Sequence, residues 1–86
     1  MDDCTSIVAI LQENRVETAP KVQDILTEYG CSIRMRLGLH DAAIGSCSST
    51  GLILLQMCGE GSTIKEMEQK LQKLPSVKVK SMSLDF

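Results

Sequence analysis

The segment that decides the fold is residues 51–58, with the sequence Gly-Leu-Ile-Leu-Leu-Gln-Met-Cys. Side chains of a β-strand alternate between the two faces of a sheet, so a strand with one wet face should alternate apolar and polar residues. Residues 52–55 are all apolar instead. This pattern predicts a central strand that is buried on both faces, and it raises the question of what covers the second face.

The chain has 86 residues, the size of one small domain, and we expect residues 1–86 to form a single unit. Tyr29 and Phe86 are its only aromatic residues, and its formal net charge is −2. Nucleic-acid binding relies on neutralising phosphates and on stacking bases against aromatic rings. The composition therefore argues against a nucleic-acid partner.

The four cysteines contain no Cys-x-x-Cys pair, and the chain starts with the acidic sequence Met1-Asp2-Asp3. No apolar run approaches the ~20 residues that a membrane span needs. These features predict a cytoplasmic protein, without a membrane partner, in which the thiols are reduced. Cys4, Cys31 and Cys58 are then expected to be small hydrophobic or terminal thiols.

Three elements are expected before the central strand. Residues 5–12 form a second strand with apolar residues on both faces. A helix follows from about Ala19 to Tyr29, with Thr18 as its cap and Pro20 in its first turn. A strand from Cys31 to His40 alternates strictly, and we expect its apolar set to face the core and its arginines to face outward. That apolar set is Ile33, Met35, Leu37 and Leu39.

Two elements are expected after the central strand. Thr63 and Glu66 have the spacing of a capping box, and an apolar stripe runs through the helix that follows until it ends near Leu74, before Pro75. In the last strand, 77–84, the apolar residues stand at odd positions in the first half and at even positions in the second. That change predicts either a bulge or a strand that leaves one partner for another.

The element order β-α-β-β-α-β predicts an α+β protein: a ferredoxin-like, ACT-like βαββαβ sandwich with a four-stranded antiparallel sheet and two helices on one face. The first and third strands are central in this plan. Val8 and Ile10, with one apolar set of residues 51–58, would then face water, which favours a partner surface on a second copy. We expect a homodimer or a homotetramer. The alternative is that the stems of four basic residues cover the patch: Arg34, Arg36, Lys78 and Lys80.

Three segments resemble a known family. Residues 24–30 (Asp-Ile-Leu-Thr-Glu-Tyr-Gly), 33–39 (Ile-Arg-Met-Arg-Leu-Gly-Leu) and 71–81 (Leu-Gln-Lys-Leu-Pro-Ser-Val-Lys-Val-Lys-Ser) are similar to the iron-only hydrogenase system regulators. The resemblance covers residues 7–84. It implies a ferredoxin-like domain related to ACT domains and to the ligand-binding domain of the nickel-responsive repressor. It also implies a non-enzymatic regulatory or sensor module that oligomerises through its sheet and is linked to iron-only hydrogenases.

The segment from Asp41 to Thr50 is the predicted ligand site. It joins two strands with about ten residues, whereas hairpin loops usually have about two to five. Successive backbone N–H groups and serine hydroxyls in such a loop can hold an anion or a carboxylate, and the alternative is an ordinary hairpin tip. The expected ligand-binding residues for a small-molecule effector are His40, Asp41, Ser46, Cys47, Ser48, Ser49 and Thr50.

His40 and Cys47 suggest two further kinds of chemistry. Imidazole and thiolate are good ligands for a transition metal, so the pair could form a metal- or thiol-based redox sensor. We favour the plainer alternative, an exposed histidine and a loop cysteine without a cofactor, because two ligands are too few. An enzyme that uses Cys47 as nucleophile, His40 as base and Asp41 as orienting group is the least favoured hypothesis.

Overall fold

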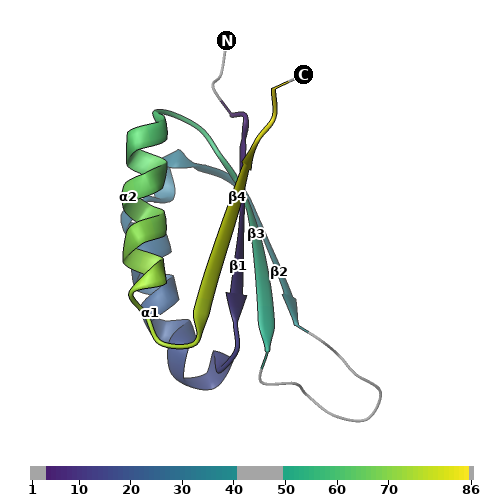
Figure 1. Ribbon diagram of the computed structural model, residues 1–86, viewed down its shortest axis with the longest axis vertical. Coiled ribbons are helices and arrows are strands. Elements are labelled where there is room, and N and C mark those ends of the chain that lie inside the picture. Colours follow the sequence, from purple (N-terminus) through teal and green to yellow (C-terminus); the bar gives the residue numbers. More distant parts are fainter. Residues whose placement is uncertain (1–3, 41–49, 86) are drawn as a thin grey trace.

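The computed structural model describes residues 4–40 and 50–85. Four strands form one antiparallel sheet in the order β2-β3-β1-β4, and both helices lie on the same side of it (Figure 1). The predicted α+β, ferredoxin-like βαββαβ arrangement is confirmed, with the first and third strands in the centre. The elements are β1 (Ser6–Gln12), α1 (Arg15–Glu28), a 3-10 turn (Gly30–Ser32), β2 (Ile33–His40), β3 (Gly51–Met57), α2 (Gly61–Gln72) and β4 (Val77–Ser83).

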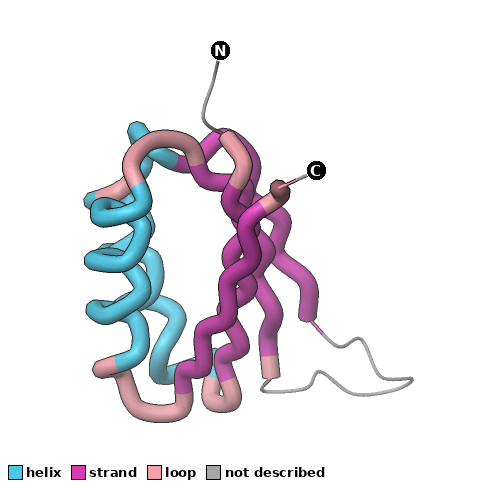
Figure 2. Tube along the Cα trace, turned by 45° about the horizontal axis from the view of Figure 1, so that its top comes forward, coloured by secondary structure: helices cyan, strands magenta, loops and turns pink. Residues whose placement is uncertain are grey.

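The hydrophobic core lies between the helix layer and the sheet, which Figure 2 shows as two separate layers. The helices contribute apolar residues one turn apart, and the two central strands contribute every second residue. Of the strand residues, Val8, Ile10, Leu55 and Met57 are fully buried. The helix side chains that meet them are Val22, Leu26, Ile64, Met67 and Leu71.

The outward-facing set of β1 differs from the prediction. Val8 and Ile10 are covered by the helices, and Ile7, Ala9 and Leu11 take the side without helices. The sequence could not distinguish the two sets, because both are apolar and a strand gives each an equal chance of either face.

Strand β2 also differs from the prediction, and a bulge is the reason. Ile33 lies opposite Met57 and packs against the core, but the pairing shifts by one residue between Ile33 and Met35. A shift of one residue sends every later side chain to the other face. Met35 and Leu37 therefore point away from the helices, whereas Arg36 lies opposite the buried Leu55, on the helix side of this edge strand.

The bulge or change of partner that we predicted in the last strand is absent. Strand β4 pairs with β1 in unbroken register from Val77 opposite Gln12 to Ser83 opposite Ser6. Val77 and Val79 face the core, and Lys78, Lys80 and Met82 fall together on the other face. The apolar positions of this strand change their alternation because Met82 is an apolar residue on the outer face.

Both helices begin earlier than predicted. The N–H groups of Glu17 and Thr18 donate to the carbonyl oxygen of Asn14, so α1 starts at Arg15 and Pro20 lies inside it. Helix α2 starts at Gly61 after Glu60, so the expected capping box of Thr63 and Glu66 is not at the helix start. In the described ranges, no helix is long and apolar enough to cross a membrane.

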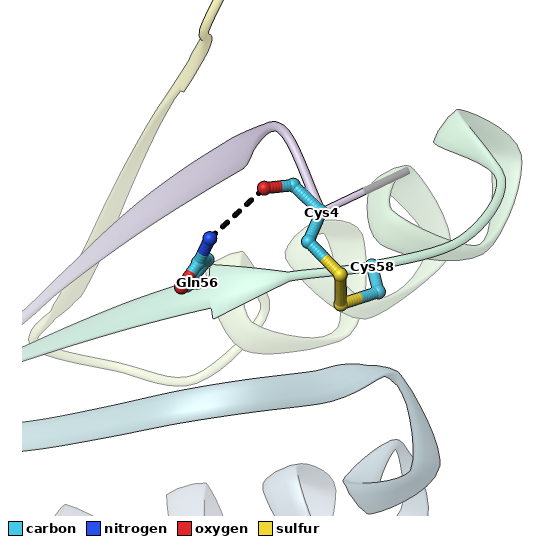
Figure 3. Close-up of a disulfide and its surroundings, with 3 residues drawn as sticks. All are labelled: Cys4, Gln56 and Cys58. Atoms are coloured by element: carbon cyan, nitrogen blue, oxygen red, sulfur yellow. Dashed lines mark hydrogen bonds between the residues drawn. A yellow bond between two sulfur atoms is a disulfide. The ribbon is translucent and has the colours of Figure 1, made fainter. Parts of the chain in front are cut away.

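Two of the cysteines are not free thiols as predicted. Cys4, just before β1, and Cys58, just after β3, form a disulfide (Figure 3). The strand order brings them together, because β1 and β3 are antiparallel neighbours and the start of one lies beside the end of the other. Cys31 is free and exposed. The expectation of reduced thiols is therefore wrong for this pair, and the cytoplasmic location stays a prediction.

Candidate functional site

The most distinctive surface of the molecule is the side of the sheet that the helices leave uncovered. We call it the open face. The strand register places an apolar residue from every strand on it. Its apolar side chains are Ile7, Ala9 and Leu11 from β1, Met35 and Leu37 from β2, Leu52 and Leu54 from β3, and Met82 from β4.

The open face is continuous from one edge of the sheet to the other. Leu37 lies opposite Leu54, Leu54 lies opposite Ala9, and Ile7 lies opposite Met82. Met35, Leu37 and Met82 expose 41%, 47% and 59% of their surface. Single exposed apolar residues are normal on a protein, but a contiguous patch marks an interaction site.

A shallow hollow of about 340 Å³ lies on the open face beside β4. Ala9, Leu11 and Leu52 form its apolar part, and Lys78 and Lys80 border it. The ammonium group of Lys78 lies 2.9 Å from a carboxylate oxygen of Glu13, and both side chains are exposed. Both lysines stand on one edge strand, so the positive charge of the open face is concentrated on one rim.

The predicted ligand site lies only partly in the described residues. His40 ends β2 and lies opposite Gly51, the first residue of β3, so the two ends of the loop are held together by strand pairing. Thr50, the residue before β3, is half-buried. Asp41, Ser46, Cys47, Ser48 and Ser49 lie outside the described residues. The ligand-binding set therefore stays a prediction.

The metal and enzyme hypotheses also stay untested. Within 4–40 and 50–85, no three His, Cys, Asp or Glu side chains gather in a way that could hold a metal ion. The proposed pair of His40 and Cys47 includes a residue beyond those ranges. The same holds for the catalytic hypothesis, which needs Cys47 and Asp41.

A polar cluster around the buried Tyr29 joins the C-terminal end of α1 to α2. The Tyr29 hydroxyl donates to Glu66 at 2.9 Å, and the Lys70 ammonium group lies 2.6 Å from Glu28 and over the Tyr29 ring. The hydrogen bond to Glu28, and next that to Tyr29, raise the pKa of Lys70. The pKa of Tyr29 is also raised: its hydrogen bond with Lys70 opposes the shift, and burial together with Glu66 outweighs it. These contacts tie α1 to α2 at the surface.

Sequence reasoning found the need for a covered second face but assigned several of its residues wrongly. Met35 and Leu37 were expected in the core, and Met82 was not recognised as an outer-face residue. The phase change in residues 77–84 was the available signal for Met82. No comparable signal marks the bulge in β2, since Arg34 continues a regular alternation.

The fold resembles several solved structures, among them the two that follow. The uncharacterized protein TM1266 from Thermotoga maritima superposes with a TM-score of 0.80 and 24% identity, covering 93% of this chain and 95% of that one. The CPII protein of Thiomonas intermedia K12, solved with bound ADP, AMP and acetate, has a TM-score of 0.53 and 14% identity. Its match covers 95% of this chain and 89% of CPII.

No curated protein sequence matches the chain. A family model does match over residues 5–81, and its description is "TM1266-like: Iron-only hydrogenase system regulator, putative". That range includes both helices, the first three strands and most of β4. The resemblance seen in the sequence is thereby confirmed, and this chain belongs to the TM1266-like family of iron-only hydrogenase system regulators.

Proposed function

We propose that this protein is a non-enzymatic regulatory or sensor module that self-associates through the open face and binds a small effector near the 41–50 loop. It is a single domain that works in the cytoplasm as a homodimer or homotetramer. The role named by its family, regulation of the iron-only hydrogenase system, is the role in which we place it.

The observation that carries the proposal is the continuity of the open face. Eight apolar side chains from four strands lie on one side of the sheet, and three of them expose about half of their surface. Burying apolar surface is favourable by roughly 25 cal/mol per Å². A second copy offers the same flat, apolar surface, and twofold pairing makes such a surface self-complementary.

The lysines on β4 favour one way of pairing two copies. If the twofold axis runs along the strands, β4 of one copy covers β2 of the other, and the lysine pairs lie on opposite rims. If the axis runs across the strands, β4 covers β4 and Lys78 and Lys80 of both copies meet. Like charges about 4 Å apart repel by about 1 kcal/mol even in water, so we favour the first arrangement.

The effector site is supported by the position of the loop. Thr50 leads directly into Gly51, and the next residues of β3 include Leu52 and Leu54 on the open face. The chain thus leaves the proposed effector site directly into the strand that forms the middle of the proposed subunit contact. CPII, which shares the fold, was solved with ADP, AMP and acetate, so adenine nucleotides are the first effectors to test.

The decisive experiment places a charge in the centre of the proposed contact. Leu54→Asp, on the central strand β3 between Leu37 and Ala9, should convert the oligomer into a monomer in sedimentation-velocity experiments, because a buried carboxylate without a partner is costly. Val16→Asp is the matched control: Val16 is 78% exposed but lies on α1, away from the open face. This control should keep the wild-type oligomer.

Two results would count against the proposal. If the wild-type protein is monomeric at high micromolar concentration, the proposed self-association is wrong. If both aspartate variants have the same oligomeric state, the open face is not the contact between subunits. Repeating the sedimentation and a thermal melt with added AMP or ADP tests the effector; an unchanged melting temperature with both nucleotides argues against this ligand class.

A further inference from the structure

The disulfide lies at the end of the sheet where β1 begins and β3 ends. Cys4 and Cys58 are 54 residues apart in sequence, and their bond joins the segment before β1 to the segment after β3 (Figure 3). The side-chain amide of Gln56 donates to the Cys4 carbonyl at 3.0 Å. Among the described contacts, this hydrogen bond is the other direct tie between the Cys4 residue and β3.

The disulfide lies outside the hydrophobic core. Cys4 and Cys58 are only half-buried, and neither belongs to the core cluster that joins the sheet to the helices. Both residues thus keep part of their surface in contact with water, whereas a disulfide enclosed in a core would be shielded from dissolved thiols. Accessible disulfides of this kind exchange with thiols more readily than enclosed structural ones.

A free thiol lies on the adjoining segment. The N–H of Cys58 donates to the carbonyl of Ser32 at 2.7 Å, and the residue before Ser32, Cys31, is an exposed free cysteine. The protein thus carries a disulfide and a reduced cysteine on neighbouring stretches of chain at the same end of the sheet. In a protein with purely structural disulfides, by contrast, every cysteine is usually paired.

We propose that Cys4 and Cys58 form a reversible redox site that reacts with low-molecular-weight thiols such as glutathione. A thiolate attacks one sulfur, forms a mixed disulfide and releases the other cysteine as a thiolate, which takes up a proton. A second thiolate then attacks the mixed disulfide and releases the remaining cysteine. In sum, two small thiols are oxidised to their disulfide, and the cysteine pair gains two electrons and two protons.

The redox state controls how firmly the start of β1 is held. After reduction, the Cys4 residue keeps the hydrogen bond from Gln56 but loses its covalent tie to β3. Ile7 and Met82 lie opposite each other at this end of the open face. Reduction should therefore loosen the part of the open face that they form and weaken self-association; this last consequence rests on the function proposed above.

The test uses the full chain with Cys31→Ser and Cys47→Ser, so that only the pair of interest titrates. The protein is equilibrated with mixtures of reduced and oxidised glutathione, and intact mass and free thiols are measured after quenching. We expect the fraction of reduced protein to rise sigmoidally with the ratio of reduced to oxidised glutathione. The reduced form should carry two more hydrogen atoms than the disulfide-linked form. In hydrogen exchange, residues 5–8 should exchange faster in the reduced form, and the amides in the middle of α2 should be unchanged.

The matched control adds Cys4→Ser and Cys58→Ser to that background, and its exchange should resemble the reduced form under all conditions. The proposal is overturned if the pair stays fully reduced or fully linked across the whole glutathione range. It is also overturned if residues 5–8 exchange equally in both states. A protein that titrates as expected but never self-associates contradicts the proposed oligomer and leaves the redox site standing.

Discussion

The two faces of the sheet have nearly the same composition but differ in how deeply their side chains are buried. On β3, Leu55 points to the helices and is fully buried, whereas its neighbour Leu54 points the other way and is only half-buried. On β1, Ile10 and Leu11 form the same contrast. Hydrophobicity alone therefore does not determine burial here. The position of the two helices does, and the open face is the apolar surface that one chain cannot cover.

Both helices lie on the same face because of chain geometry. Each βαβ half connects its strands by a crossover, and these connections are right-handed in nearly all proteins. Two crossovers of the same hand in this strand order bring both helices to one side (Figure 1). A monomer with this topology leaves the other side bare, whatever residues it carries.

The largest effect should come from truncating the buried member of the pair on β3. Leu55→Ala leaves a cavity beneath the helices and should lower the free energy of unfolding by about 2–5 kcal/mol. Leu54→Ala removes the same atoms from the open face and should cost clearly less, because its surroundings are partly water. Urea denaturation of dilute protein, where association is weakest, measures both. Equal losses would mean that the open face is as well covered as the core.

An intermediate effect on stability is expected where β1 ends and α1 begins. The Thr18 hydroxyl donates to the Asn14 carbonyl at 2.8 Å and lies 3.4 Å from the Gln12 amide oxygen, and the Thr18 and Gln12 side chains are almost fully buried. Thr18→Val keeps the shape and removes the donor, so unfolding should become easier by about 1 kcal/mol.

Thr27→Val is the control for this substitution, because Thr27 is exposed on the same helix. Its thermal melt should stay close to that of the wild type, within the ~0.5 kcal/mol usual for surface positions. A Thr18 variant as stable as the Thr27 variant would show that this buried hydroxyl contributes nothing to the helix-covered side.

The smallest effect should come from the exposed ion pair of Lys70 and Glu28, which links the two helices. Partner hydrogen bonds, first that of Glu28, raise the pKa of Lys70 above its ordinary value of 10.5. A raised pKa in the folded state means that the stabilisation is complete below pH 10.5 and is lost as the pH rises above it. Lys70→Gln should therefore lower the melting temperature slightly and evenly through neutral pH.

The difference from wild type should shrink in strongly alkaline solution, and melts across pH measure it. Lys73→Gln, near the end of the same helix, is the control and should show no such convergence. A Lys70 effect as large as that of Leu55 would contradict the view that burial under the helices dominates stability, since exposed ion pairs contribute little.

Sequence periodicity predicted the sheet and the helices, but it did not predict their exact bounds or faces. The apolar alternation of residues 33–39 correctly indicated a strand. It could not reveal the bulge after Ile33, because the shift becomes visible only in the pairing with Met57 and Gln56. Similarly, Pro20 suggested a helix start, since proline is least costly there. The helix instead begins at Arg15 and tolerates the loss of one internal hydrogen bond.

The cysteine pair shows the same limit of sequence reasoning. Spacing along the chain gave no reason to link Cys4 to Cys58, since they are 54 residues apart and form no motif. They meet because β1 and β3 are antiparallel neighbours, which is a property of the strand order. A pairing that depends on topology cannot be found from spacing alone.

By itself, the sequence determined the element order, the fold class, the family and the central position of residues 51–58. These depend on local periodicity and composition, which are written along the chain. Only the tertiary structure decided which face of each strand is covered, where β2 bulges and which cysteines meet. Those features depend on register and crossover hand, which relate residues far apart in sequence. In this structure Gly51–Met57 has the helices on one side and, on the other, the open face to which we assign a second copy.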